Sequence, residues 1–256
     1  MLKILREYIN YKLNAKGRHG VHSPFVYEFV DNCLRKKVPK TVYKRFKSYK
    51  KQLNRDNSSL KMNDLGSGSK KLNQQRKIKD IAKVSGTSDK YGKLLFKLVN
   101  HYQPKTILEL GTSLGIGTFM LAKGNPESKV ITVEGCPETS AVAQRMQKEF
   151  QIKNIDFVVS DFVSYLKNYK GERLDLIFID GDHKGSKLLE ILNLIDNNIH
   201  EETIFLLDDI RWSGDMMHTW NELIASEKYH LSMDLFKMGI IMIRSHQEKE
   251  HFKIRL

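Results

Sequence analysis

Short apolar runs alternate with helix-like segments through the last two thirds of this 256-residue chain. A segment is helix-like when its apolar residues recur every three or four positions. Parallel strands need a crossover of a dozen or more residues between them, and a helix usually supplies it. The alternation therefore predicts an α/β fold with a doubly wound parallel sheet. The five strands expected from these runs are residues 106–110, 129–133, 155–159, 174–179 and 203–207.

Two further apolar runs, residues 229–236 and 239–243, close the pattern. Because no helix fits between them, they are expected to pair as an antiparallel hairpin at one edge of the sheet. With this C-terminal hairpin the expected sheet has seven strands. The helices expected around the strands are residues 88–102, 115–123, 137–150, 162–169, 184–197 and 215–226.

The positive charge of the chain is concentrated in its first third. Residues 1–86 contain 22 Lys and Arg against 6 Asp and Glu, whereas the remainder contains 21 against 24. Apolar spacing here predicts three helices, the last of them basic and striped with Tyr43, Phe46 and Tyr49. The segments expected along the chain are a basic helical N-terminal extension, a polar linker and an α/β domain, at residues 1–60, 61–86 and 87–256.

The two cysteines, Cys33 and Cys136, lie far apart and have no CxxC spacing. This usage argues against a disulfide framework or a zinc knuckle and is typical of a reducing compartment. Charged residues interrupt the N-terminus too often for a signal peptide, and no apolar run approaches the ~20 residues of a membrane span. We therefore expect a cytoplasmic protein.

Three glycines follow the first expected strand in LELGTSLGIG, residues 108–117. Glycine permits tight turns and close approach of the backbone to a ligand, and the next helix presents its N-terminal amides at the same point. A dinucleotide-binding turn requires the spacing G-x-G-x-x-G. The spacing here is G-x-x-x-G-x-G, so it disfavours a nicotinamide cofactor.

The wider pattern Glu-x-Gly-x-x-x-Gly resembles motif I of class I S-adenosylmethionine-dependent methyltransferases, whose fold is Rossmann-like. In that family the loop passes under the methionine part of the cofactor. The resemblance covers roughly residues 85–245 and implies a methyltransferase that binds S-adenosylmethionine. The loop residues that it assigns to the cofactor site are Glu109, Gly111, Thr112, Ser113 and Gly115.

Acidic residues close the next two expected strands, at the edge where wound α/β sheets bind ligands. Glu134 stands 23 residues after Gly111, where the family has a carboxylate for both ribose hydroxyls. Asp161 and Phe162 match the family's polar and apolar contacts to adenine, and Ser160 replaces the glycine that usually precedes them. Asp161 equally suits the N-cap of the following helix.

A narrower resemblance, to O-methyltransferases of the catechol, caffeoyl-CoA and macrolide-sugar types, appears in FIDGDHKG and LLDDIRWS. Those enzymes hold magnesium with an acid after the fourth strand and a pair of acid or amide residues after the fifth; Asp180, Asp208 and Asp209 occupy these positions. Carboxylates suit Mg²⁺ or Mn²⁺, which activates a hydroxyl. His183 matches the catalytic histidine of the sugar-methylating members, and an imidazole is a suitable base. The resemblance thus implies catalytic roles for His183 and Asp180.

The favoured hypothesis is an enzyme that methylates a hydroxyl of a small molecule, with or without a metal ion. A second hypothesis is a methyltransferase or binding protein that acts on RNA, or that contacts another polyanion such as an anionic membrane. The basic N-terminal third and its aromatic stripe would supply phosphate contacts and stacking. A third is a cofactor-binding protein without activity. The N-P-P-Y type of motif that marks methylation of base amines is absent from the sequence, which favours oxygen as the acceptor.

Overall fold

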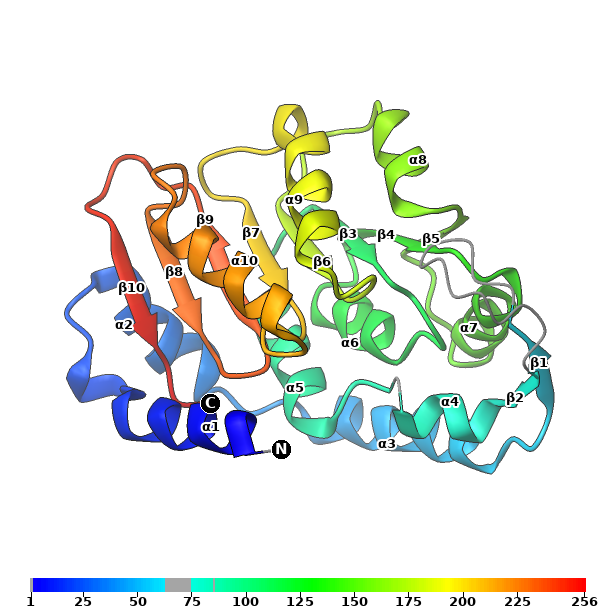
Figure 1. Ribbon diagram of the computed structural model, residues 1–256. Coiled ribbons are helices and arrows are strands. Elements are labelled where there is room, and N and C mark those ends of the chain that lie inside the picture. The colour runs from blue at the N-terminus through cyan, green and yellow to red at the C-terminus, as the bar shows by residue number, and fades with distance from the viewer. Residues whose placement is uncertain (1, 63–74, 85) are drawn as a thin grey trace. The chain divides into compact units, whose positions relative to one another are not determined.

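The structure, a computed structural model, describes residues 2–62, 75–84 and 86–256 (Figure 1). The chain forms two compact units. One unit is discontinuous and consists of Met1–Lys36 together with Gly171–Leu256, and the other is Lys37–Lys170.

The continuous unit is built on three parallel strands in the order β3-β4-β5. Every residue of β3 is buried. Helices follow each strand, as a parallel arrangement requires. The strands and their following helices are β3 Thr106–Leu110, α6 Ile116–Gly124, β4 Lys129–Glu134, α7 Pro137–Glu149, β5 Ile155–Val159 and α8 Phe162–Lys167.

Elements before β3 complete this unit. A two-stranded antiparallel hairpin precedes a short helix, and the contact between α5 and α6 is among the most extensive in the chain. These elements are α3 Lys40–Arg55, β1 Ser59–Lys61, β2 Gln75–Lys77, α4 Ile78–Val84 and α5 Asp89–Tyr102.

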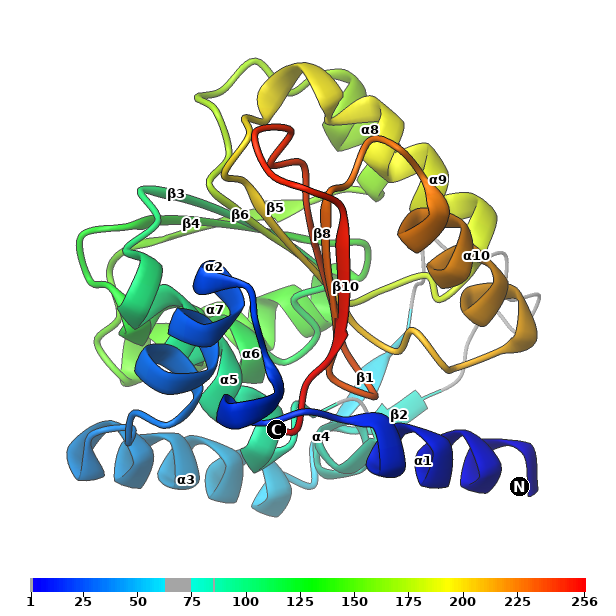
Figure 2. The ribbon, with the colours of Figure 1, turned by 90° about the vertical axis from the view of Figure 1, so that its left-hand side faces the viewer.

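The discontinuous unit contains five strands in the order β10-β8-β9-β7-β6. Strands β6 and β7 are parallel, β9 runs antiparallel to both β7 and β8, and β10 runs parallel to β8. Figure 2 shows α9 and α10 on one side of β8 and β10, with α2 on the other. The strands are β6 Leu176–Ile179, β7 Ile204–Leu207, β8 Leu231–Asp234, β9 Gly239–Met242 and β10 Glu250–Lys253. The helices are α1 Leu2–Asn14, α2 Pro24–Glu28, a π-helical continuation Phe29–Leu34, α9 Gly185–Leu194, α10 Gly214–Ala225, and 3₁₀ turns at Arg18–Gly20 and Asp196–Asn198.

The predicted Rossmann-like α/β fold, with its parallel strands and C-terminal antiparallel hairpin, is confirmed. The predicted number of seven strands is wrong, because β10 adds an eighth. Its sequence, EHFK, contains only one residue with a strong apolar side chain. It is held by pairing with β8 in the register Glu250 with Leu231 through Lys253 with Asp234.

The compact units divide the chain differently from the predicted segments. They divide after Lys36 and after Lys170, whereas we expected boundaries after residues 60 and 86. Residues 63–74 and 85 of the predicted linker lie outside the described residues. Helix α3, expected to belong to an extension, lies in the same unit as the glycine loop, because its apolar face packs on α4 and α6.

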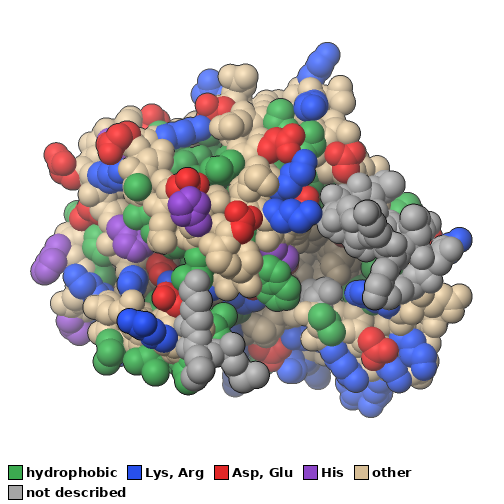
Figure 3. All heavy atoms as spheres, in the orientation of Figure 1, with side chains coloured by type: hydrophobic (Ala, Val, Ile, Leu, Met, Phe, Trp, Pro, Cys, Tyr) green, Lys and Arg blue, Asp and Glu red, His purple; other side chains and the backbone are tan. Residues whose placement is uncertain are grey.

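The basic helix α3 has two contrasting faces. Phe46, Tyr49 and Leu53 are completely buried. Its lysines and arginines are exposed except for Lys50, which pairs with Asp89, and Figure 3 shows Lys and Arg side chains gathered over α3 and α4. The positive charge is therefore on the surface, but two of the three aromatic residues proposed for base stacking are core residues. Within the described part of the chain, no helix is long and apolar enough to cross a membrane.

Candidate functional site

The glycine loop leaves β3 through an unusual backbone path. Gly111 has a φ of 112°, Ser113 of 48° and Gly115 of 73°. L-residues rarely adopt the φ of Gly111, and Gly115 stands directly before α6. The turn therefore connects the end of β3 to the N-terminus of α6, which is where wound α/β proteins place an anion- or nucleotide-binding loop.

Glu109 lies beneath the loop and not in it. Its side chain is buried and accepts hydrogen bonds from Thr118 Oγ1 at 2.5 Å and Thr132 Oγ1 at 2.6 Å. Burial raises the pKa of Glu109 to about 7, although both threonine hydrogen bonds lower it. Glu109 thus joins β3 to α6 and β4, and supports the loop from inside.

Glu134, at the end of β4, touches the loop directly. One carboxylate oxygen accepts a hydrogen bond from Ser113 N at 2.7 Å, and the other accepts one from Cys136 N at 2.9 Å. Glu134 therefore braces the loop, and it stands at the strand end where a ribose-binding carboxylate is predicted.

The third strand end lies beside the second. Ser160 N donates to the carbonyl of Glu134 at 3.1 Å, which brings the start of α8 near the loop. Asp161 caps α8 by accepting from Ser164 N at 2.9 Å, and this hydrogen bonding lowers its pKa. Phe162, the first residue of α8, is half-buried. The structure thus brings together the predicted cofactor residues of β3, β4 and β5, and it shows the N-cap interpretation of Asp161.

Helix α3 supports the glycine loop, a contact that the sequence did not predict. Tyr49 Oη donates to the carbonyl of Leu114 at 2.8 Å, and Gln147 Nε2 donates to the carbonyl of Gly115 at 3.0 Å. A Cβ at Gly115 would lie 2.8 Å from Tyr49 Oη. The signal in the sequence was the aromatic stripe of α3, which the polyanion hypothesis assigned to stacking.

The predicted acceptor-side residues lie in the other unit, after β6 and β7. Asp208 N donates to the carbonyl of Ile179 at 2.9 Å, so the ends of these strands are adjacent. A small pocket there is lined by side chains that include His183, Lys184, Asp208 and Met216. His183 Nε2 lies 3.6 Å from Asp209 Oδ2, and its ring is 5.6 Å from that of Trp212.

Lys237, in the turn between β8 and β9, lies among the predicted metal ligands. Its Nζ is 2.7 Å from Asp208 Oδ2 and 3.4 Å from Asp209 Oδ1. Burial lowers the pKa of Lys237, but Asp208, Asp209 and Asp180 together raise it above its usual value. Burial, followed by the charge of Asp208, raises the pKa of Asp209. The sequence did not point to Lys237, because it lies 29 residues after Asp208 and only the turn between β8 and β9 places it beside the acids.

These acids do not fit a divalent cation in the arrangement observed. Across residues 2–62, 75–84 and 86–256, no group of three or more His, Cys, Asp or Glu could hold a metal ion. An ammonium already contacts Asp208 and approaches Asp209. A second cation beside it would be repelled. The magnesium or manganese implied by the resemblance is therefore not supported by this geometry.

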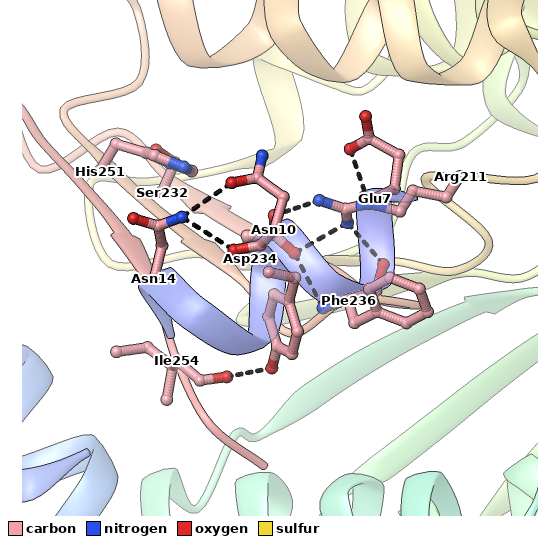
Figure 4. A network of polar contacts seen from close by, with 10 residues as sticks. Glu7, Asn10, Asn14, Arg211, Ser232, Asp234, Phe236, His251 and Ile254 are labelled. Carbon is pink, nitrogen blue, oxygen red and sulfur yellow. Dashed lines mark hydrogen bonds and ion pairs between the residues drawn. The ribbon is translucent and has the colours of Figure 1, made fainter. Parts of the chain in front are cut away.

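Figure 4 shows the buried ion pair that holds the segment following the acid pair. Arg211 Nη1 and Nη2 lie 2.9 and 2.5 Å from the two carboxylate oxygens of Asp234, and Nη1 also donates to the carbonyl of Phe236 at 2.6 Å. Helix α1 contributes Glu7, 3.9 Å from Arg211 Nε, and Tyr11, which donates to the carbonyl of Ile254. A bidentate pair of this kind fixes both position and orientation. It anchors the loop of Asp208 and Asp209 to the turn of Lys237.

A family model described as a methyltransferase domain matches residues 108–210. This stretch begins at the glycine loop and ends just after the acid pair. This stretch of the chain is therefore similar to a methyltransferase domain. Among curated proteins, a catechol O-methyltransferase of Mycobacterium tuberculosis is 33% identical to it over 101 residues, which are 39% of this chain and 46% of that protein. The chain spans about half the length of the curated catechol O-methyltransferases that it matches.

Solved structures resemble this chain over most of its length. The Podospora anserina methyltransferase PaMTH1, bound to SAH, matches with a TM-score of 0.60 at 17% identity, covering 88% of this chain and 99% of that one. A Bacillus cereus O-methyltransferase in complex with SAH matches with a TM-score of 0.54 at 18% identity, covering 85% and 96%. At these identities the likeness establishes the fold.

Proposed function

We propose that the chain transfers a methyl group from S-adenosylmethionine to a hydroxyl of a small molecule. The observation that carries the proposal is the bond from Ser113 N to Glu134, which joins the positive-φ glycine loop to an acid at the next strand end. A glycine loop and a strand-end carboxylate are what a nucleoside with a charged tail requires. The similarity to a catechol O-methyltransferase and to two methyltransferases bound to SAH agrees with it.

The cofactor residues divide by the part of S-adenosylmethionine that they would contact. Gly111, Thr112, Ser113 and Gly115 would line the methionine portion with their backbone, while Glu109 would hold the loop in shape. Glu134 would accept hydrogen bonds from the two ribose hydroxyls. Ser160, Asp161 and Phe162 would border the adenine.

His183 would act as the general base toward the acceptor hydroxyl. Its Nε2 would take the hydroxyl proton while the oxygen attacks the methyl carbon. The carbon–sulfur bond breaks as the carbon–oxygen bond forms, which leaves a methyl ether, S-adenosylhomocysteine and a protonated imidazole. Asp209, 3.6 Å away, would stabilise that positive charge. Asp180, in the same strand-end cluster, would help to orient the acceptor, and no step of this proposal uses a metal ion.

Labelled S-adenosylmethionine identifies the acceptor class. The purified chain is incubated with the label and with a cell extract separated into small molecules, lipid, RNA and protein. We expect label in the small-molecule fraction, stable to base as an ether is. Label in RNA would instead support the polyanion alternative, which the buried Phe46 and Tyr49 do not favour. A cytoplasmic location remains our prediction, on the grounds of the two thiols.

A further inference from the structure

Asp180, Asp208 and Asp209, which follow β6 and β7, need a compensating positive charge. Asp208 is 4% exposed, and its Oδ1 is buried without a hydrogen-bond partner among the described residues. A buried carboxylate that lacks a counter-charge costs several kcal/mol. The charge that faces Asp208 here is the ammonium of Lys237, at 2.7 Å.

The position of Lys237 is fixed by its backbone as well as by its side chain. Its carbonyl accepts a hydrogen bond from Ile210 N at 3.0 Å, so the lysine turn is joined to the residue after the acid pair. Phe236, just before it, has a φ of 74° and accepts from Arg211. Hydrogen bonds to the turn therefore hold the backbone of Lys237 in the position from which its ammonium contacts the carboxylates.

We propose that Lys237 is a built-in cation, which takes the place of a divalent metal ion at Asp208 and Asp209. It holds the two carboxylates in place, with Asp209 Oδ2 3.6 Å from His183 Nε2. Lys237 thus acts as a positioning residue. The acid cluster has no need of a metal while the lysine is present. Removing the positive charge exposes oxygen ligands of the kind that Mg²⁺ and Mn²⁺ prefer.

The direct test is Mn²⁺ binding, measured by electron paramagnetic resonance on the whole chain. The wild type is expected to leave Mn²⁺ unbound, as is Lys237→Arg, which keeps the charge. Lys237→Met keeps the aliphatic stem but loses the charge, and should bind Mn²⁺ at least about tenfold more tightly than the wild type. The matched control is Lys228→Met, which removes a lysine paired with Asp196 elsewhere in the same unit and should bind none.

Two results would overturn the inference. One is a wild type that binds Mn²⁺ as tightly as Lys237→Met does. The ammonium of Lys237 would then not prevent a metal ion from binding to Asp208 and Asp209. The other is a folded Lys237→Met variant with no gain in binding. If Lys237→Met does not fold, Lys237→Gln supplies a neutral side chain that can still donate a hydrogen bond to Asp208, and the same gain is expected.

The catalytic consequence rests on the proposed function and is measured separately. Wild-type methyl transfer should be unchanged by a chelator, whereas Lys237→Met should lose about tenfold or more in turnover and recover part of it with Mn²⁺. Lys237→Arg should restore turnover without metal. Loss of wild-type turnover to a chelator would contradict the inference. If no acceptor is methylated at all, the proposed function fails, while the Mn²⁺ measurement still decides the role of Lys237.

Discussion

Glu109 holds a proton up to about pH 7 in the folded chain, because burial raises its pKa to about that value. The unfolded chain loses the same proton near the ordinary pKa of glutamate, about 4.3. The folded state therefore binds more protons between these pH values, and the contribution of Glu109 to stability falls as the pH rises through them.

Replacing Glu109 with Gln should remove this dependence. Between about pH 5 and pH 8, the wild type should lose roughly 2–3 kcal/mol of unfolding free energy relative to Glu109→Gln. Urea unfolding of both proteins at each pH measures the difference. A constant difference across the range would show that Glu109 does not hold the proton.

Glu134 offers the sharpest test of a cofactor contact. Glu134→Ala removes a charged acceptor and should weaken S-adenosylhomocysteine binding by about 1.5–3 kcal/mol in calorimetry. Because Glu134 also braces Ser113, the melting temperature must be recorded for the same variant. Glu127→Ala, an exposed acid elsewhere in this unit, is the matched control. An unchanged dissociation constant in Glu134→Ala would exclude the ribose assignment.

His183 is predicted to act as the general base. His183→Ala should lower turnover by about a hundredfold or more while cofactor affinity stays within a factor of two or so. His218→Ala, an exposed histidine on α10, should change neither. Full turnover in His183→Ala would show that His183 is not the general base.

At the scale of elements, α3 is part of the compact unit that contains the glycine loop. Phe46 packs against Phe119 of α6 with ring centroids 6.1 Å apart, and Gly92 of α5 is so close that a Cβ there would lie 2.7 Å from Phe46. The aromatic stripe of this helix therefore stabilises the loop, while all of its charged side chains except Lys50 are exposed.

Phe46→Ala should lower the free energy of unfolding by roughly 3–5 kcal/mol, because it leaves a cavity in the core. Lys44→Ala, on the exposed face, should change it by less than about 0.5 kcal/mol. Chemical denaturation of the full chain measures both. If both variants change the free energy of unfolding by equally small amounts, α3 is a surface extension and not part of the core.

The limits of sequence reasoning appear at the same scale. The positions of β3, β4 and β5 were predictable because each is a bounded apolar run. Helix α4 and strand β10 were not, since one is short and the other is polar, and both depend on neighbours distant in sequence. Likewise, Glu134 follows from its spacing after Gly111, but Lys237 reaches the acids only through a turn whose position is set by tertiary packing.

At the scale of the whole molecule, the uneven charge of the sequence is distributed over both units. The basic first third contributes α1 and α2 to one unit and α3 and α4 to the other. Its net charge is therefore a property of the surface of an α/β protein and does not define a separate binding module. The acids and Lys237 belong to one unit, and the glycine loop and Glu134 to the other.

The central claim is that the glycine loop and its strand-end acid bind S-adenosylmethionine and its demethylated product. Isothermal titration of the full chain with S-adenosylhomocysteine, and in a parallel run with NAD, tests this most directly. We predict saturable binding of S-adenosylhomocysteine at one site per chain, weakened in Glu134→Ala, and no heat of binding with NAD. Binding of NAD, or a folded chain that does not bind S-adenosylhomocysteine, would contradict the account.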